Sequence, residues 1–553
     1  MLPSADSTES VRGEPVSDPP AALKRLEAAP PLGLSPRRIL MVAGPVILVM
    51  VGWAAWSTRP AAQPLVQSET PRFDVEPDVA PTDPATSLPQ TSTASLSAGT
   101  THLNARPLPP DNTTSDEPSS RRALAQTGAT PPGDWPAPYG PFHDGCSRET
   151  GLRFDWDERG PGIAWEAPIG LGYNIPVVAH GTLFAWSRYG DVERLEARAI
   201  ETGALRWSTE FPASYVSPFD YSAGPHASPV VVDGIVYILG AAGEARAMRA
   251  DDGRLLWERH LKRDYRLPDT PYSLGASPLV AEGIVVLQLP GKESGAGLVG
   301  LDAATGETLW TATNHGLSFA TPRLVPGSTP PTFIAFTTFG VLHVDLRTGR
   351  LIDQFKFGVG ESRERVNAVA PVLIGERVYA IAGPGPGTLA LSLEPDGKFR
   401  LLWRNRRLLD SQYTSVIWHE GHLYGFNSLW NGTCELRCID TAEARQVWAL
   451  ESDLRRGQLI YADGRLIALG EKGHLGVIDL RRATLATHGS GESVVRTTST
   501  DDQPDIPPPP HVVTRDPFLE GACYSAPALA DGRLILRNER RLVVIDCRPR
   551  PTP

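Results

Sequence analysis

The stretch "GLVGLDAATGETLW", Gly297–Trp310, combines an apolar run, a short polar turn and a second run that ends in tryptophan. The same order returns in "ARAIETGALRW", which ends at Trp207, in "AMRADDGRLLW", which ends at Trp257, and in "CIDTAEARQVW", which ends at Trp448. Apolar runs joined by a turn of this kind are typical of β-hairpins. A hairpin that recurs along a chain predicts a repeat architecture.

Each residue type in the turn has a structural reason. Asp302 can accept hydrogen bonds from backbone N–H groups ahead of it, and Gly306 can adopt the positive φ of a tight turn. Trp310 supplies a large apolar surface that can pack against the neighbouring repeat. The recurring motif is therefore predicted to hold successive repeats together.

The repeats can be followed from their first β run to their closing aromatic residue. The openings lie at Ile175-Pro176, Ser228-Pro229, Ser277-Pro278, Thr321-Pro322, Ala370-Pro371, Ser415-Val416, Gly457-Gln458 and Ala526-Pro527. The closing aromatics are Trp207, Trp257, Trp310, Phe355, Trp403 and Trp448. Four short β runs in each unit of about 42–53 residues predict a β-propeller.

The two ends of the repeat region complement each other. The last unit, "GRLILRNERRLVVIDCRP", stops after its third run, and "GIAWEAPIG" (162–170) is a closing run without the three runs before it. We predict that this N-terminal strand completes the last blade, which removes an open sheet edge. The fold class is all-β: an eight-bladed propeller of four-stranded blades, with seven blades as the alternative because the seventh unit is weak. A Pro-rich insertion at about Thr484–Phe518 is assigned to the last blade.

The region before the propeller divides into three parts. Residues 1–37 form a predicted disordered cytoplasmic tail, 38–57 a transmembrane helix with no charge from 39 to 57, and 58–134 a disordered Pro/Ser/Thr-rich spacer. Arg37 and Arg38 lie at the start of the helix, so the propeller, residues 135–550, is expected outside the cytoplasm. The expected location is the bacterial inner membrane, single-pass, with a periplasmic propeller; a cleaved signal peptide is the alternative.

Charge and cysteine spacing exclude several classes of protein. A formal net charge of −10 argues against nucleic acid as a partner. The five cysteines have no CxxC spacing, which argues against a zinc ribbon or a thioredoxin-like site. Ring closure would bring Cys146 near Cys523, so a disulfide is conceivable there, with Cys547 as the rival partner.

The units resemble the PQQ-like (pyrroloquinoline-quinone-like) propeller repeat, whose docking motif has the form A-x-D-x-x-T-G-x-x-x-W. "LDAATGETLW", Leu301–Trp310, is a near-complete match, and the resemblance covers residues 136–548. The group contains quinoprotein dehydrogenases and non-catalytic scaffolds similar to the BamB outer-membrane assembly factor. The resemblance therefore implies the fold and leaves the function open.

Resemblance to the dehydrogenases of this group would imply PQQ as the cofactor and a Ca²⁺ held by carboxylate and amide oxygens. It would also imply an Asp base and, in many members, a pair of adjacent cysteines. No two cysteines are adjacent here, and the ligand set does not map onto this sequence. We expect no catalytic, cofactor-binding or metal-binding residues, and a membrane-anchored binding or scaffold module with an unknown protein partner. The alternatives are a PQQ-dependent alcohol dehydrogenase-like quinoprotein, which would hold PQQ with Ca²⁺, and a BamB-like outer-membrane assembly factor.

One connection is the candidate for a partner or ligand surface. "PASYVSPFDYSAGPHASP" (212–229) crowds four rings just before an inner strand: Tyr215, Phe219, Tyr221 and His226. Such connections lie around the channel mouth on one rim of a propeller. By contrast, "WHEGHLY" (418–424) lies in the register of a hairpin, so a metal site is not expected there.

Overall fold

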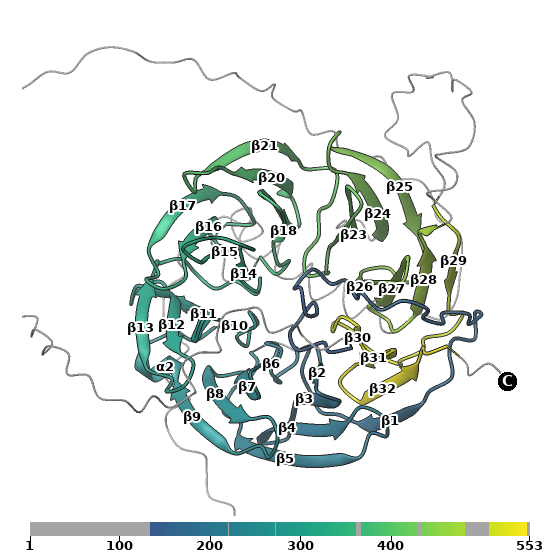
Figure 1. Ribbon diagram of the computed structural model, residues 1–553, viewed down its shortest axis with the longest axis horizontal. Helices are drawn as coiled ribbons and strands as arrows, with labels where there is room; N and C mark the ends of the chain where they lie inside the picture. The colour runs from purple at the N-terminus through teal and green to yellow at the C-terminus, as the bar shows by residue number, and fades with distance from the viewer. Residues whose placement is uncertain are drawn as a thin grey trace, which may run out of the picture. The chain divides into compact units, whose positions relative to one another are not determined.

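The computed structural model describes residues 133–218, 221–270, 272–360, 367–428, 434–481 and 508–549. They form eight four-stranded antiparallel sheets arranged around one axis, as Figure 1 shows. The predicted eight-bladed propeller is confirmed. The expected tail, membrane helix and nearly all of the spacer lie outside the described residues; within them, no helix is long and apolar enough to cross a membrane.

Each blade runs from an inner strand near the axis to an outer strand at the periphery (Figure 1). Blade 1 consists of β2 (Val177–Ala179), β3 (Thr182–Tyr189), β4 (Val192–Ala199) and β5 (Leu205–Pro212). Blade 2 consists of β6 (Val230–Val232), β7 (Ile235–Leu239), β8 (Glu244–Arg249) and β9 (Leu255–His260). Blade 3 consists of β10 (Leu279–Ala281), β11 (Ile284–Gly291), β12 (Ala296–Asp302) and β13 (Thr308–Ala312). Blade 4 consists of β14 (Arg323–Leu324), β15 (Thr332–Phe336), β16 (Gly340–Asp345) and β17 (Leu351–Lys356). One short helix, α2 (Leu261–Asp264), follows β9.

The second half repeats this order. Blade 5 consists of β18 (Val372–Ile374), β19 (Arg377–Ala382), β20 (Gly387–Leu393) and β21 (Phe399–Asn405). Blade 6 consists of β22 (Ile417–His419), β23 (His422–Ser428), β24 (Cys434–Asp440) and β25 (Arg445–Glu451). Blade 7 consists of β26 (Gly457–Ala462), β27 (Arg465–Gly470), β28 (Leu475–Asp479) and β29 (His511–Val513). Blade 8 consists of β30 (Ala528–Ala530), β31 (Arg533–Arg537), β32 (Arg541–Asp546) and β1 (Trp165–Pro168).

The closing aromatics of the sequence motif join neighbouring blades. The indole Nε1 of a tryptophan in the outer strand donates to a backbone carbonyl in the next blade's last turn. These pairs are Trp165–Ile200 (2.8 Å), Trp207–Ala250 (3.1 Å), Trp257–Ala303 (2.9 Å), Trp310–Leu346 (3.0 Å) and Trp403–Thr441 (3.1 Å). The predicted role of the motif, as the contact between blades, is confirmed, with a hydrogen bond added to the apolar packing.

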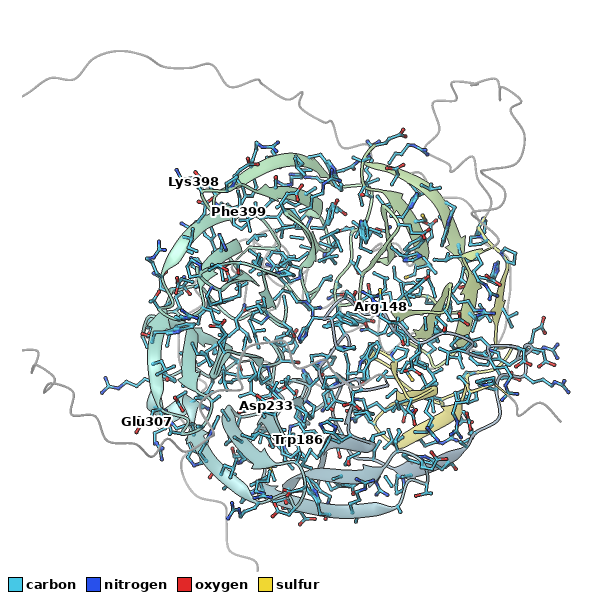
Figure 2. All side chains as sticks on the ribbon, viewed as in Figure 1. Arg148, Trp186, Asp233, Glu307, Lys398 and Phe399 are labelled. Atoms are coloured by element: carbon cyan, nitrogen blue, oxygen red, sulfur yellow. The ribbon has the colours of Figure 1, made fainter. Side chains whose placement is uncertain are left out.

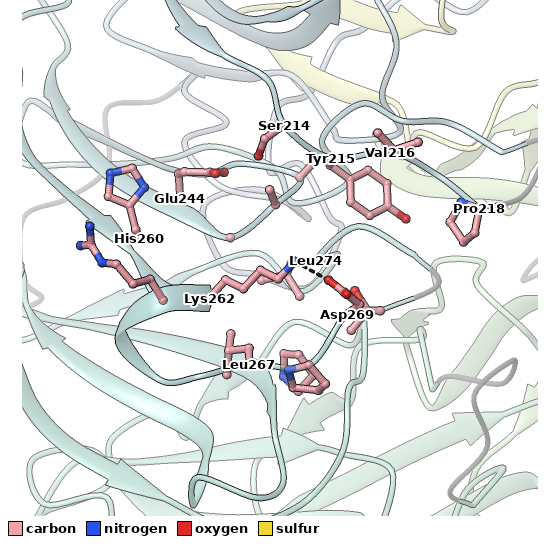
Figure 3. Close-up of a pocket in the computed structure, with 17 residues that line it drawn as sticks. Ser214, Tyr215, Val216, Pro218, Glu244, His260, Lys262, Leu267, Asp269 and Leu274 are labelled. Atoms are coloured by element: carbon pink, nitrogen blue, oxygen red, sulfur yellow. Dashed lines mark hydrogen bonds and ion pairs between the residues drawn. The ribbon is translucent and has the colours of Figure 1, made fainter.

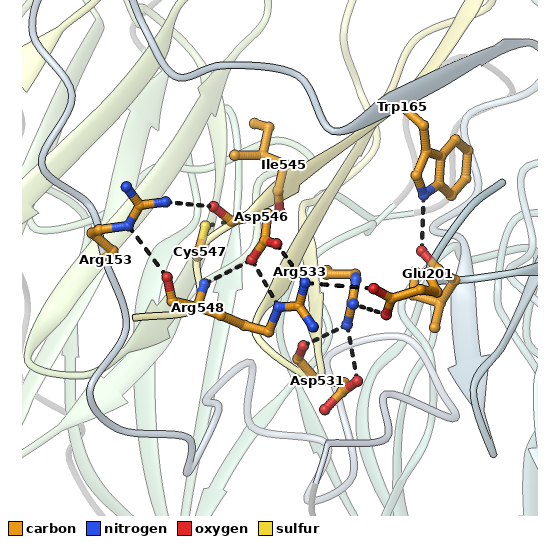
Figure 4. Close-up of polar contacts among 10 residues, drawn as sticks. Arg153, Trp165, Glu201, Asp531, Arg533, Ile545, Asp546, Cys547 and Arg548 are labelled. Carbon is orange, nitrogen blue, oxygen red and sulfur yellow. Dashed lines mark hydrogen bonds and ion pairs between the residues drawn. The ribbon is translucent and has the colours of Figure 1, made fainter. Parts of the chain in front are cut away.

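The ring closes as predicted, by the N-terminal strand. β1 pairs antiparallel with β32, from Trp165 opposite Val544 to Pro168 opposite Arg541. Close by, Arg533 forms ion pairs with Asp531 (2.9 Å) and Glu201, and so connects blade 8 with the last turn of blade 1 (Figure 4).

A buried arginine reinforces this closure. Arg537 of β31 is 0% exposed. Its guanidinium donates to the carbonyl oxygens of Gly170 (2.9 Å), Gly172 (2.8 Å) and Trp186 (3.1 Å) and to Asn174 Oδ1 (3.2 Å). Gly170, Gly172 and Asn174 lie between β1 and β2, and Trp186 lies in β3, so one side chain connects the last blade with the first.

Two expectations are wrong. The Pro-rich insertion belongs to the seventh blade, because β29, which follows it, pairs with β28 as the outer strand of that blade. The sequence placed it in the last blade because no closing tryptophan marks the end of the seventh unit. The conceivable disulfide is also not formed, since Cys146, Cys523 and Cys547 are all free thiols.

A segment before β1, residues 133–148, crosses the centre of the ring; we call it the lead-in segment. It bonds to the inner strands of two blades, since Trp135 bridges to Val178 of blade 1 and Cys146 bridges to Tyr461 of blade 7. Figure 2 shows Arg148 near the centre of the view, whereas Glu307 and Lys398 lie at the periphery.

Candidate functional site

The strand order gives the propeller two different faces. In every blade the first-to-second and third-to-fourth turns lie on one face, here called the lower face. The second-to-third turns and the connections between blades lie on the other, the upper face. The lead-in segment begins on the lower face, where Asp134 Oδ1 accepts a hydrogen bond (2.9 Å) from the N–H of His180, in the β2–β3 turn.

An aromatic cluster lies at the centre of the upper face. It is formed by residues from the connections that precede the inner strands: Tyr173, Tyr221, His226, Tyr272, Phe319, Tyr413 and Tyr524. Rings that enter from different sides of a ring of blades can touch only near its axis. We call these seven residues the central aromatic cluster.

The ring contacts cross several blades. Tyr173 stacks on His226 with centroids 4.9 Å apart and meets Tyr524 edge-on, also at 4.9 Å. Tyr524 contacts Tyr413 at 5.2 Å, and His226 contacts Phe319 at 6.0 Å. A chain of five rings thus connects blade 4 to blade 6 by way of blades 2, 1 and 8.

A glycine makes room for this packing. Gly275 precedes the inner strand of blade 3 at the position that carries a ring in several other blades. A Cβ at Gly275 would lie 2.6 Å from Cγ of Phe319, so the ring occupies the space that a side chain would need. The small residue in blade 3 therefore allows Phe319 of blade 4 to reach His226.

An ion pair borders the cluster. Arg456 lies 2.7 Å from Glu471 Oε2, and its Cζ lies 5.2 Å from the centre of the Tyr413 ring. The Tyr413 hydroxyl donates to the same carboxylate oxygen at 3.2 Å. On the other side, Glu539 Oε1 accepts the N–H of Gly172 at 3.0 Å. Both carboxylates are therefore already engaged by donors of the chain.

Burial keeps His226 neutral at physiological pH. It lowers the pKa of the imidazole to about 4, against a smaller opposing effect of a hydrogen bond to the backbone of Ser222. The Nε2 atom is buried and has no hydrogen-bond partner among the described residues. His226 thus presents an uncharged ring within the cluster.

The four residues singled out from the sequence have different positions. Tyr221, 41% exposed, and His226 belong to the central aromatic cluster. Phe219 lies outside the described residues. Tyr215 lines a groove of about 700 Å³ on the upper face, between the connections that follow blades 1 and 2.

The groove has walls of mixed polarity (Figure 3). Tyr215 and Val216 form one wall, and Lys262 and Asp269, which form an ion pair, lie on the other. Val216 is 79% exposed. The groove therefore offers both apolar and charged contacts.

Sequence reasoning missed Tyr272 and four further residues of the cluster, Tyr173, Phe319, Tyr413 and Tyr524. A positional signal was present, because these four residues and His226 each lie four residues before the first residue of an inner strand. Superimposing the blade openings would have placed the five rings at one structural position.

The stretch 418–424 forms the hairpin that its register predicts. His419 ends β22, Glu420 and Gly421 form the turn with φ of 46° and 82°, and His422 begins β23. Within the described ranges, no three His, Cys, Asp or Glu side chains gather in a group that could hold a metal ion.

Comparison with known proteins gives relatives of two kinds. A family model described as "Outer membrane protein assembly factor BamB" matches residues 153–313 and 269–450, which together extend over more than half of the chain. The curated outer membrane protein assembly factor BamB of Burkholderia pseudomallei is 28% identical over 240 residues, 40% of this chain and 54% of that protein. The chain thus spans about half the length of this curated relative.

Solved structures share the fold at low identity. Quinohemoprotein alcohol dehydrogenase from Comamonas testosteroni is 13% identical with a TM-score of 0.50, over 77% of this chain and 82% of that one. BamB from Moraxella catarrhalis is 13% identical with a TM-score of 0.47, over 70% of this chain and 99% of that one. With its eight four-stranded blades and the extent of the family match, the chain belongs to the PQQ-like β-propeller family that the BamB model represents.

Proposed function

We propose that this protein is a non-catalytic binding module that holds a protein partner on the upper face of the propeller. The observation that carries the proposal is the central aromatic cluster, in which rings from six connections meet on a partly exposed surface. Tyrosines combine a large apolar ring with a polar hydroxyl and are enriched at protein interfaces. The neighbouring groove, with Val216 exposed at its wall, extends the same face.

The proposal includes a tether. Residues 38–57 would anchor the chain in the bacterial inner membrane, with the N-terminus cytoplasmic and the propeller periplasmic. The chain enters the propeller at Gly133, beside Asp531 in the β30–β31 turn of the lower face. A partner on the upper face would therefore bind opposite the point where the spacer enters.

The first alternative is a PQQ-dependent dehydrogenase-like quinoprotein. Its cofactor needs oxygen ligands for Ca²⁺ and a flat space between rings, but the described residues of the cluster do not fit this need. The rings contact one another directly, and Glu471 and Glu539 are engaged by Arg456 and by the N–H of Gly172. This contact pattern favours the binding module.

The second alternative is a BamB-like assembly factor of the outer membrane. The family match and the curated relative favour it. The expected membrane helix, in place of a lipidated cysteine, argues against it. It is a specific form of the binding module and differs only in the identity of the partner.

Site-specific photo-crosslinking of the full chain in its native membrane tests the proposal. A photoreactive residue at Tyr221, 41% exposed in the cluster, should give a discrete protein adduct. The matched control is Leu351, 37% exposed on the outer strand β17, which should give none. No adduct at either position, or equal adducts at both, would contradict the proposed face. An adduct with a component of outer-membrane protein assembly would select the second alternative.

A further inference from the structure

The inner strand of blade 4 begins with a charged residue, Arg323. The other inner strands begin with Val177, Val230, Leu279, Val372, Ile417, Gly457 and Ala528, none of which is charged. At this position the propeller otherwise packs apolar or small side chains. The arginine therefore has no explanation in the repeat itself.

The lead-in segment covers this arginine. The Cζ atom of Arg323 lies 4.4 Å from the centre of the Tyr139 ring, and the side chain is 7% exposed. Burial and the charge of Arg323 lower the pKa of His143 to about 4, so this neighbour is uncharged. The cation thus lies where the lead-in segment crosses the ring, beside an aromatic face and a neutral imidazole.

The contacts of Arg323 differ from those of the other buried arginines. Of the four arginines buried in the described ranges, Arg246 pairs with Glu258 at 2.6 Å, Arg533 pairs with Asp531 and Glu201, and Arg537 donates to four acceptors of the β1–β3 region. Arg246 Nη1 and Arg533 Nη2 also lack a hydrogen bond, but they lie beside the carboxylates of Glu193 and Glu201. In Arg323, by contrast, both Nε and Nη1 are buried and have no hydrogen-bond partner among the described residues.

A carboxylate that acts on Arg323 is engaged by other donors. Asp144 acts electrostatically on Arg323, but its Oδ2 lies 2.6 Å from Arg148 and its Oδ1 accepts the N–H of Cys146 at 2.9 Å. Burial lowers the pKa of Arg323 to about 10, which still leaves the guanidinium charged at neutral pH. A buried, charged donor without an acceptor is costly, and an anion would remove that cost.

We propose that Arg323 binds a small oxyanion, of the phosphate or carboxylate class, at the place where the lead-in segment crosses the centre of the ring. The unpaired N–H groups of the guanidinium supply hydrogen-bond donors and the charge, which suit carboxylate and phosphate. Tyr139 covers one side of the guanidinium, so binding also holds the lead-in segment against blade 4. The site is separate from the central aromatic cluster and does not depend on the proposed partner.

Thermal unfolding of the purified full chain tests this site, with inorganic phosphate and acetate as probes at constant ionic strength. The wild-type protein should show a saturable rise in Tm with one or both probes, and Arg323→Met should show none. In buffer without either probe, Arg323→Met should be at least as stable as the wild type, because it removes an unpaired buried charge while Met keeps contact with Tyr139. The control Arg347→Met, an arginine whose side chain is 62% exposed on the same blade, should respond as the wild type does.

Two measurements keep the test decisive. Isothermal titration of the wild type with phosphate and acetate should show saturable binding, and the anion that binds assigns the class. Arg323→Lys, which keeps the charge but loses the planar fork, should weaken that binding at least several-fold. An equal Tm response of the wild type and Arg323→Met, or no saturable binding of either probe, would overturn the proposal.

Discussion

The indole Nε1 of Trp257 in blade 2 donates a 2.9 Å hydrogen bond to the carbonyl oxygen of Ala303 in blade 3. The ring also covers Gly306, where a Cβ would lie 2.8 Å from the indole. Four other tryptophans repeat the hydrogen bond around the ring. The contact between blades therefore has a polar component and a steric component that can be measured separately.

Removal of the polar component should have a modest effect. Trp257→Phe keeps most of the apolar ring but leaves the carbonyl of Ala303 without this donor, so we expect a loss of about 1 kcal/mol in the free energy of unfolding. Urea unfolding followed by circular dichroism measures it. In blade 4 the corresponding place, opposite the last residue before the β-bulge, is taken by Asp353, so the fold already forms one blade without an indole there. A loss above about 3 kcal/mol would mean that packing rather than the hydrogen bond had been disrupted.

The steric component can be isolated with a pair of glycines. Gly306 has φ of 73° and Gly327 has φ of 71°, so alanine at either position carries the same backbone strain, about 1–2 kcal/mol. Only at Gly306 does the new Cβ meet the Trp257 ring, since nothing lies within 4 Å at Gly327. Gly306→Ala should therefore lower the Tm clearly more than Gly327→Ala. Equal losses would show that the indole does not need the space.

The ring closure should depend on Arg537. Arg537→Met leaves the carbonyl oxygens of Gly170, Gly172 and Trp186 without this buried donor, and we expect a loss of about 3 kcal/mol or more in the free energy of unfolding. Hydrogen exchange should show faster opening of β1 than in the wild type. Arg540→Met, an exposed arginine three residues further on, serves as the control and should change little. Unchanged protection of β1 in Arg537→Met would contradict this role.

Glu193 should make stability depend on pH. The side chain is 2% exposed, and burial raises its pKa to about 7; the N–H of Ala241, Arg246 and Arg188 oppose the shift, and Glu244 adds to it. The folded protein therefore holds this proton more tightly than the unfolded chain, whose glutamate has a pKa near 4.3. This contribution is complete below about pH 4.3 and is lost as pH rises through about 7.

The matching variant is Glu193→Gln, which cannot titrate. Between about pH 5 and 8, the wild type should lose roughly 3 kcal/mol more than the variant, on the order of the pKa shift at 1.36 kcal/mol per unit. Urea unfolding of both proteins across that pH range provides the comparison. Parallel pH profiles for the two proteins would contradict the assignment.

Local chemistry explains what could be predicted from the sequence. The spacing of Asp302, Gly306 and Trp310 predicts a turn and a docking ring within ten residues. The last unit lacks its fourth strand, and the single strand at Trp165 supplies it, so the closure of the propeller could also be predicted. Only Tyr221 and His226 of the seven residues in the central aromatic cluster were found, because the rings are far apart in sequence and become neighbours only when the propeller closes. The unpaired state of Arg323 had no local signal at all, since it depends on the path of the lead-in segment.

The central claim, a binding module rather than a quinoprotein dehydrogenase, is most directly tested by thermal unfolding of the full chain with and without pyrroloquinoline quinone plus Ca²⁺. A ligand present at 100 times its Kd stabilises the folded state by about 2.7 kcal/mol, which is readily detected as a shift in Tm. Our account predicts no shift with the quinone and Ca²⁺ together, relative to Ca²⁺ alone. A Ca²⁺-dependent rise in Tm caused by the quinone would contradict it and would identify the chain as a quinone-binding protein.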